Sequence, residues 1–145
     1  MPAPPVLLAS PDDTEQQFYD ALQRGDIDRL MAVWADEDDI ACVHPGGPRI
    51  VGASAIRASF DAMFANGGIQ ADAANVRRLH SDEAAVHHVL ERVQAAAGPG
   101  VQVAWVLATN VYLKTTQGWR LVLHHASPGS SRELQEVVDA PALLH

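Results

Sequence analysis

The chain has 145 residues, of which 48% are hydrophobic and 19% are charged, a composition typical of one globular domain rather than of a disordered or fibrous protein. Its formal net charge of −8 disfavours binding to nucleic acid or to an anionic membrane surface. The single cysteine, Cys42, cannot form an internal disulfide, which fits a reducing compartment. Residues 1–9 lack the features of a signal peptide and no apolar run could span a bilayer, so we expect a cytoplasmic protein.

Three helices are predicted in the first half of the chain. The first has Ser10 as its N-cap and runs from about Pro11 to Arg24. Asp26 caps a second helix, in which apolar residues recur at helical spacing: Ile27, Leu30, Met31 and Trp34. Ser54 caps a third helix with the same spacing: Ile56, Phe60, Met63 and Phe64.

Extended structure is predicted for most of the remaining chain. Residues 39–44 and 49–51 flank a Pro-Gly-Gly-Pro turn and are typical of a short hairpin. Four longer antiparallel strands follow, at about 69–80, 84–95, 101–116 and 119–127. Early helices and a late strand meander predict an α+β domain over residues 10–127, in which a curled antiparallel sheet packs around N-terminal helices and encloses a pocket, followed by a C-terminal tail at 128–145.

Four segments carry a family resemblance through their order along the chain: Arg24-Gly25-Asp26, Cys42-Val43-His44-Pro45, Thr109-Asn110-Val111-Tyr112 and the last strand up to Ser127. The sequence is similar to the SnoaL-like and ketosteroid isomerase-like proteins, which share the cone-shaped fold of nuclear transport factor. It also resembles the association domain of calcium/calmodulin-dependent protein kinase type II. These proteins include isomerases, cyclases, dehydratases and non-catalytic modules, so the resemblance implies the fold and assigns no single function.

The resemblance places the polar residues of a steroid isomerase at positions where this chain has other residues. The family's tyrosine falls on Phe18, its strand carboxylate on Cys42 and its second acid near Thr109. Tyr19, next to Phe18, is expected to point about 100° away around the helix. Enolate chemistry needs a base and hydrogen-bond donors at those places, so we do not expect steroid isomerisation.

Alternation along the hairpin puts Ile40, Cys42 and His44 on one face. His44 could serve at the mouth of the pocket as a base or hydrogen-bond partner, or it could only shape the turn before Pro45. Cys42 is expected to be an unreactive core residue, because free cysteines are often buried.

The last strand contains adjacent histidines, of which alternation sends one to each face. Leu123 and His125 share the more apolar face with Trp119 and Leu121. We therefore expect His125 in the pocket and mostly buried, with Leu123 beside it.

The pair His87 and His88 poses the same choice, and both of its faces are mixed in polarity. The resemblance favours His88 and Arg92 as inward residues. The alternative for Arg92 is a surface position beside an acid, because an unpaired buried charge is very costly.

Trp105 shares a face with Thr109 on a predicted strand and could form a pocket wall, although it and Trp34 could equally be core residues. Asn110 lies on the other face unless a bulge turns it, so only the resemblance includes it. The complete set of expected ligand-binding residues is Phe18, Trp34, Cys42, His44, His88, Arg92, Trp105, Thr109, Asn110, Leu123 and His125.

The seven histidines do not predict a metal centre. The sequence has no His-x-His or Glu-x-x-His spacing, and a site would require His44, His88 and His125 to converge. We therefore expect no metal and no cofactor.

The leading hypothesis is a domain that binds a small organic molecule without catalysing a reaction, in a mostly apolar pocket with polar groups from His44, Arg92, Asn110 and His125. The expected ligand carries a carbonyl or carboxylate group. One alternative is an isomerase, cyclase or dehydratase with His44 or His125 as general acid-base, and another is a non-catalytic oligomerisation module. A homodimer through the exposed sheet face is expected, with His145 exposed at the terminus.

Overall fold

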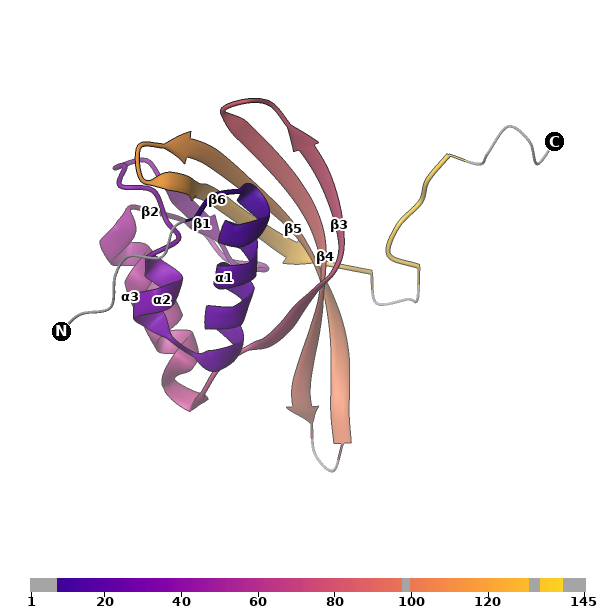
Figure 1. The fold of residues 1–145 in the computed structure, drawn as a ribbon. Coiled ribbons are helices and arrows are strands. Elements are labelled where there is room, and N and C mark those ends of the chain that lie inside the picture. The colour runs from indigo at the N-terminus through magenta and orange to yellow at the C-terminus, as the bar shows by residue number, and fades with distance from the viewer. Residues whose placement is uncertain (1–7, 98–99, 131–133, 140–145) are drawn as a thin grey trace.

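The computed structural model of this chain describes residues 8–97, 100–130 and 134–139. Within these residues the strands form one curled, open sheet in the order β2-β1-β6-β5-β4-β3, and the helices lie on its concave side (Figure 1). The α+β fold expected from the sequence is confirmed. No helix of the described part is long and apolar enough to cross a membrane. His145, expected to be exposed, lies outside the described residues.

The first helix, α1 (Pro11–Arg24), has the predicted bounds and caps. The hydroxyl of Ser10 accepts a hydrogen bond from the backbone N–H of Asp13, which satisfies one of the free donors at the helix start. The helix ends at Gly25, whose φ of 67° is in the left-handed region that glycine adopts without steric cost.

The next two helices differ in detail from the prediction. Helix α2 (Ile27–Met31) is short and does not include Trp34, because the chain there turns to form a β-bridge between Trp34 and Leu121. Helix α3 (Ala53–Met63) has Gly52 rather than Ser54 at its N-cap, with no side-chain capping bond. A short 3₁₀ turn, η1 (Phe64–Asn66), follows α3.

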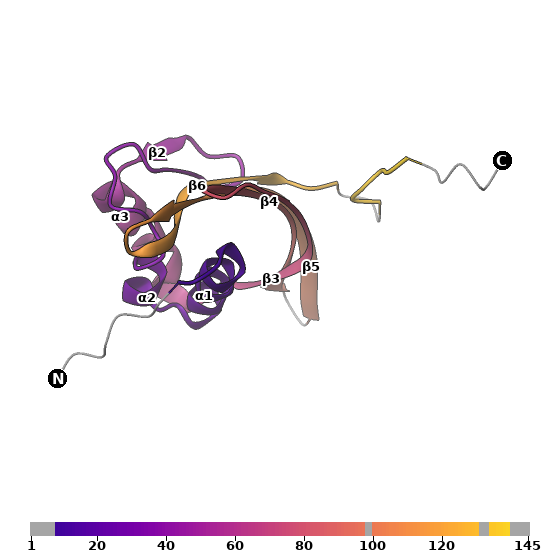
Figure 2. The same cartoon turned by 45° about the horizontal axis from the view of Figure 1, so that its top comes forward.

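The strands follow the predicted order: β1 (Ala41–Val43), β2 (Arg49–Val51), β3 (Gln70–His80), β4 (Ala84–Ala97), β5 (Gly100–Thr115) and β6 (Gly118–Pro128). Strands β3 to β6 form an antiparallel meander, and β1 pairs parallel to β6, which joins the early hairpin to the late strands. The sheet arches over α1 (Figure 2), so this helix is covered on more than one flank. Phe18 and its neighbour Tyr19 are therefore both buried, although neighbouring residues of a helix point about 100° apart.

A bulge in β6 reverses the expected orientation of His125. Leu121 pairs with Tyr112 and Leu123 pairs with Val111, which leaves one extra residue in β6 between the two pairs. Trp119 and Leu121 are buried as predicted, but beyond the bulge the buried histidine is His124. His125 is exposed, so its placement in the pocket is wrong, because a one-residue insertion exchanges the two faces of a strand.

The expected faces of β4 and β5 are also reversed. The concave side carries His87, Val89 and Glu91 of β4 together with Ala108, Asn110 and Tyr112 of β5, all of them buried. The convex side, which we call the outer face, carries Val86, His88, Leu90 and Arg92 of β4, Trp105, Leu107, Thr109 and Val111 of β5, and Leu123 and His125 of β6. The polar groups of the concave side are buried because they bond to one another and to α1, and single-strand polarity does not reveal such pairing.

Candidate functional site

A chain of hydrogen bonds crosses the concave side from β6 to β4. His124 Nδ1 donates to Asn110 Oδ1 at 2.5 Å, Asn110 Nδ2 donates to the Tyr19 hydroxyl at 3.1 Å, and that hydroxyl donates to Glu91 Oε2 at 2.6 Å. Every donor in this series of hydrogen bonds points toward Glu91. The arrangement therefore delivers hydrogen bonds to a single buried carboxyl group, whose exposed fraction is only 5%.

Burial sets the ionisation of the two ends of this chain. It raises the pKa of Glu91 to about 7, although the bond from Tyr19 acts in the opposite direction and the charge of Glu15 adds to the rise. Burial also lowers the pKa of His124 to about 3, so this imidazole is neutral at physiological pH. Glu91 can therefore take up or release a proton near neutral pH, which is what a general acid-base requires.

A second chain connects β3, β4 and β5 to the same helix. Glu15 Oε2 accepts hydrogen bonds from the Tyr112 hydroxyl at 2.9 Å and from His87 Nδ1 at 2.7 Å. His87 Nε2 lies 2.8 Å from Nε2 of His80, which is exposed. An imidazole that donates from Nδ1 can accept a hydrogen bond at Nε2, so His87 can bond to Glu15 and to His80 at the same time.

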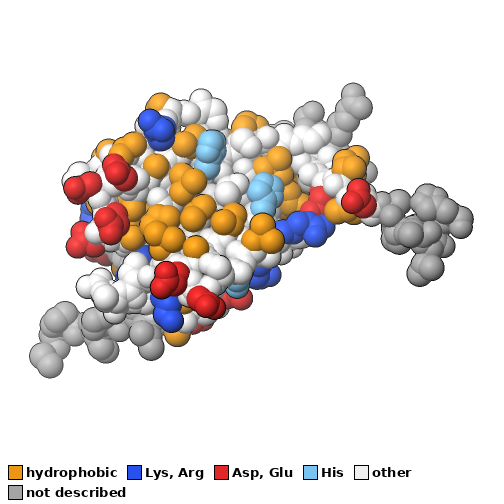
Figure 3. Space-filling model, turned by 90° about the horizontal axis from the view of Figure 1, so that it is seen from above, with side chains coloured by type: hydrophobic (Ala, Val, Ile, Leu, Met, Phe, Trp, Pro, Cys, Tyr) orange, Lys and Arg blue, Asp and Glu red, His pale blue; other side chains and the backbone are white. Residues whose placement is uncertain are grey.

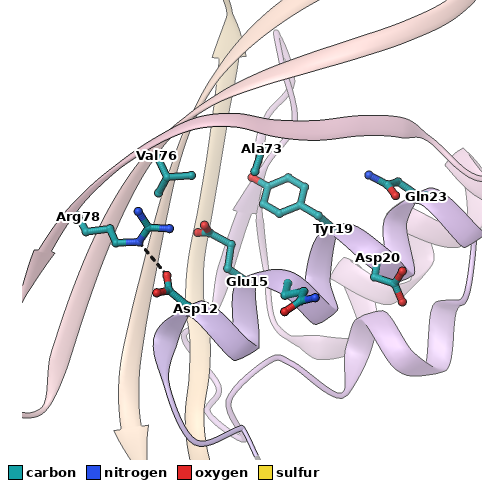
Figure 4. A pocket seen from close by; sticks show the side chains of 9 residues that line it. Asp12, Glu15, Tyr19, Asp20, Gln23, Ala73, Val76 and Arg78 are labelled. Atoms are coloured by element: carbon teal, nitrogen blue, oxygen red, sulfur yellow. Dashed lines mark hydrogen bonds and ion pairs between the residues drawn. The ribbon is translucent and has the colours of Figure 1, made fainter.

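A cavity of about 550 Å³ opens between α1 and β3 (Figure 4). It is lined by Asp12, Glu15, Gln16, Tyr19, Asp20 and Gln23 of α1 and by Ala73, Val76 and Arg78 of β3. Arg78 Nε donates to Asp12 Oδ1 at 2.8 Å across the cavity. Glu15 and Tyr19 belong both to this lining and to the two hydrogen-bonded chains, so the cavity is in contact with the buried polar groups.

The local sequence explains how the two walls of the cavity form. Asp12, Glu15 and Tyr19 follow one another at helical spacings of three and four, which places them on one flank of α1. On β3 the pairing with β4 shifts between Ala73 and Asn75. The bulge lets Ala73, which pairs with Glu91, and Val76, which pairs with Val89, both face the helix.

Three of the expected site residues lie on the concave side. Phe18 and Cys42 are fully buried, and Asn110 is the central link of the first hydrogen-bonded chain. Burial and the nearby charge of Glu91 raise the pKa of the Cys42 thiol to about 12. Trp34 is also buried, but it lines a separate groove with residues of α2 and α3.

His44 lies half-buried between the hairpin and α3. Its Nε2 is 3.0 Å from the Ser59 hydroxyl and 3.9 Å from Cys42 Sγ, and its ring packs edge-on against Phe60. Burial lowers the pKa of His44. His44 therefore shares a face with Cys42, as alternation predicts, although it does not line the α1–β3 cavity.

The remaining expected site residues lie on the outer face: His88, Arg92, Trp105, Thr109, Leu123 and His125. His44, His88 and His125 thus do not converge. The group of potential metal ligands in the described part of the chain is instead Asp12, Glu15 and His87, whose ligand atoms lie within 4.8 Å of one another. Asp12 is paired with Arg78 and Glu15 with His87, so a metal ion would have to displace existing partners.

Sequence reasoning did not select Glu15, Tyr19, His87, Glu91, Tyr112 or His124 as site residues. Alternation does group His87 with Glu91, and helical spacing groups Glu15 with Tyr19. These groups come together only through the register between β4 and β5 and the packing of α1 against the concave side of the sheet.

Comparison with known proteins shows which family and which solved structures this chain resembles. Residues 12–131 match the SnoaL-like domain. A structure from Thiobacillus denitrificans, assigned as a calcium/calmodulin-dependent protein kinase type II association domain, is 33% identical, with a TM-score of 0.78 over 86% of this chain and 99% of that chain. A Streptomyces avermitilis structure, assigned as a dehydratase of the NTF2-like family, is 29% identical, with a TM-score of 0.73 over 81% and 93%.

An NTF2-like protein of unknown function from Pseudomonas putida is 22% identical, with a TM-score of 0.70 over 88% of this chain and 89% of that chain, a likeness of fold. No curated protein matches the chain.

Proposed function

Because this chain belongs to the SnoaL-like domain family, we propose that it binds a small organic molecule in the cavity between α1 and β3. The observation that carries this proposal is the carboxylate of Glu15. Its side chain lines the cavity and is almost fully buried, and its two hydrogen bonds both reach Oε2. Oε1 has no hydrogen-bond partner among the described residues, so a ligand in the cavity could supply one.

The size and lining of the cavity suit a small organic molecule. Ligand pockets commonly have volumes of about 300–1,000 Å³ and combine apolar walls with a few polar groups. Here Ala73, Val76 and the ring of Tyr19 offer apolar surface, and Glu15 offers a fixed acceptor. This site takes the place of the mostly apolar pocket expected around His44, Arg92, Asn110 and His125.

The test uses a substitution that fills the cavity. Ala73 is exposed and lines the cavity, whereas Ala74, the next residue, is also exposed and does not line it. Compounds extracted from purified wild-type protein, Ala73→Trp and Ala74→Trp would be compared by mass spectrometry. We expect a compound that accompanies wild type and Ala74→Trp and is depleted in Ala73→Trp. Equal recovery of that compound from all three would contradict binding in this cavity.

A second candidate function, acid-base catalysis, is favoured by the buried pair of Glu91 and Tyr19. The pKa of Glu91, raised by burial to about 7, suits proton transfer at neutral pH, and the similar structure assigned as a dehydratase belongs to a class of enzyme that moves protons. The extracted compound would be incubated with protein in D₂O. Deuterium incorporation with wild type that is lost with Glu91→Gln supports catalysis, and no incorporation above buffer contradicts it.

Self-association is favoured by the outer face. Figure 3 displays one side of the molecule on which hydrophobic side chains gather around histidines. Val103 and Leu113 of β5 continue the apolar row of the outer face and are exposed. The similarity to a structure assigned as an association domain also supports a homodimer through this face.

A further inference from the structure

We infer that the ligand of the α1–β3 cavity is an organic cation, whose ammonium or guanidinium group binds Oε1 of Glu15. This inference rests on the proposed binding function and adds the chemical class of the ligand. It differs from the sequence-based expectation of a carbonyl- or carboxylate-bearing compound, because a carboxylate placed in the cavity would meet the carboxylate of Glu15.

The charged groups of the lining favour a cation. Three carboxylates line the cavity, those of Asp12, Glu15 and Asp20, against the single guanidinium of Arg78. Arg78 is paired with Asp12 at 2.8 Å. Asp20 is paired with Arg24 and Arg29, which line a neighbouring groove rather than this cavity. Unlike Asp12 and Asp20, Glu15 has no Arg or Lys partner within 4.0 Å in the described part of the chain.

The contacts of Glu15 fix the position of its carboxylate. His87 donates through Nδ1 to Oε2, and Nε2 of His87 lies 2.8 Å from Nε2 of His80. Tyr112 donates to the same carboxylate oxygen. Because both donors bind Oε2, the carboxylate is held in one orientation and the acceptor capacity of Oε1 remains for a ligand. A charge-assisted hydrogen bond at this low-exposure site, where Glu15 is only 5% exposed, is stronger than one in water.

The form of the cavity favours an organic cation over a bare metal ion. A volume of about 550 Å³ leaves room for a carbon framework beside the charged group. Figure 4 shows Tyr19 next to Glu15 on the helix wall, with Ala73 and Val76 on the strand wall. These side chains would pack against the framework, whereas a metal ion at Asp12 would have to compete with the guanidinium of Arg78.

The test compares three probes of similar size and different charge: benzylammonium, benzoate and benzyl alcohol. Each is titrated into ¹⁵N-labelled protein while amide resonances are followed by NMR. In wild type we expect benzylammonium to shift the resonances of α1 and β3 and to bind at least about tenfold more tightly than benzoate, a difference that corresponds to about 1.4 kcal/mol. This comparison needs no variant.

Glu15→Gln tests the role of Oε1 directly. The glutamine carbonyl can still accept from Tyr112 and His87, while its amide group places a donor where the free acceptor was. The matched control is Asp13→Asn, which removes the same charge one residue from Asp12 but outside the cavity. We expect the preference for benzylammonium to disappear in Glu15→Gln and to persist in Asp13→Asn.

The outcomes separate this inference from the proposed function. If benzylammonium shifts the cavity resonances no more than benzoate does, the cationic class is wrong, and a compound depleted only from Ala73→Trp would still support binding in the cavity. If Mg²⁺ or Zn²⁺ shifts the same resonances and abolishes the benzylammonium shifts in wild type but not in Glu15→Gln, the site is a metal site and the inference is overturned. If Ala73→Trp binds benzylammonium as wild type does, the cation binds elsewhere and the inference also fails.

Discussion

The thiol of Cys42 is enclosed by the core, and this burial determines its chemistry. The side chain is fully buried, and burial together with the charge of Glu91 raises its pKa to about 12. We therefore predict that an aromatic disulfide reagent at mildly alkaline pH leaves Cys42 unmodified in the folded protein and modifies it in denaturant, because the thiolate is the reactive form. Modification of the native protein as fast as of the unfolded chain would contradict this prediction.

The carboxyl of Glu91 makes stability depend on pH in an unusual direction. Its pKa rises from 4.5 in the unfolded chain to about 7 in the folded protein. The folded state therefore holds this proton more tightly, and the contribution of Glu91 to the free energy of unfolding falls as the pH rises from about 4.5 to 7, by about 3 kcal/mol in total. Glu91→Gln should remove this loss. Urea denaturation across that range would measure it, and a pH-independent difference between wild type and Glu91→Gln would contradict it.

The imidazole of His124 makes stability depend on pH in the opposite direction from Glu91. Its pKa falls from 6.5 in the unfolded chain to about 3 in the folded protein. The unfolded state then binds the proton more tightly, so stability rises with pH from about 3 to 6.5. We predict that the two slopes nearly cancel in wild type between about pH 4.5 and 6.5, and that His124→Asn exposes the fall caused by Glu91. Urea denaturation of wild type, Glu91→Gln and His124→Asn between about pH 4.5 and 6.5 measures these slopes. A steep change in the stability of wild type, with no change in either variant, would contradict the prediction.

At the scale of elements, the junction between α1 and the start of β3 depends on a close contact of backbones. A Cβ atom on Gly68 would lie 2.0 Å from the carbonyl oxygen of Gln23, whereas a Cβ on Gly100 would meet nothing within 4 Å. We predict that Gly68→Ala lowers the free energy of unfolding by about 2 kcal/mol or more and that Gly100→Ala changes it by less than about 0.5 kcal/mol. Thermal or urea denaturation measures both, and equal effects would contradict the contact.

The strands show where prediction from sequence succeeded and where it stopped. The order of the elements and the bounds of α1 were predictable, because capping residues, apolar spacing and turn residues act locally. Which face of β4, β5 and β6 is buried was not predictable. The polarity along each strand is mixed, and the alternation of polar and apolar residues does not reveal the bulge after Leu121. His124 and His125 exchanged roles for this reason.

For the whole molecule, the outer face predicts association into a dimer. Light scattering should give about twice the chain's 15.5 kDa at micromolar concentration. Val111 lies at the middle of the outer face between Val86 and Leu123, so Val111→Glu should shift the protein toward monomer by placing a charge in the interface. Val51→Glu, at the edge strand β2, is the matched control and should leave the mass unchanged. A monomeric wild type, or equal effects of both variants, would contradict this interface.

The sequence by itself determined the bounds of α1, the presence of two further helices and the order of the strands along the chain, since each depends on neighbours within a few residues, and this order indicated the α+β class. It also indicated the concave position of Cys42 and its inert surroundings. Only the tertiary structure decided which polar groups meet. Glu15, Tyr19 and Glu91 come from segments up to 76 positions apart in the chain. They are buried because the sheet arches over α1, where Tyr19 bonds to Glu91 and Glu15 bonds to Tyr112.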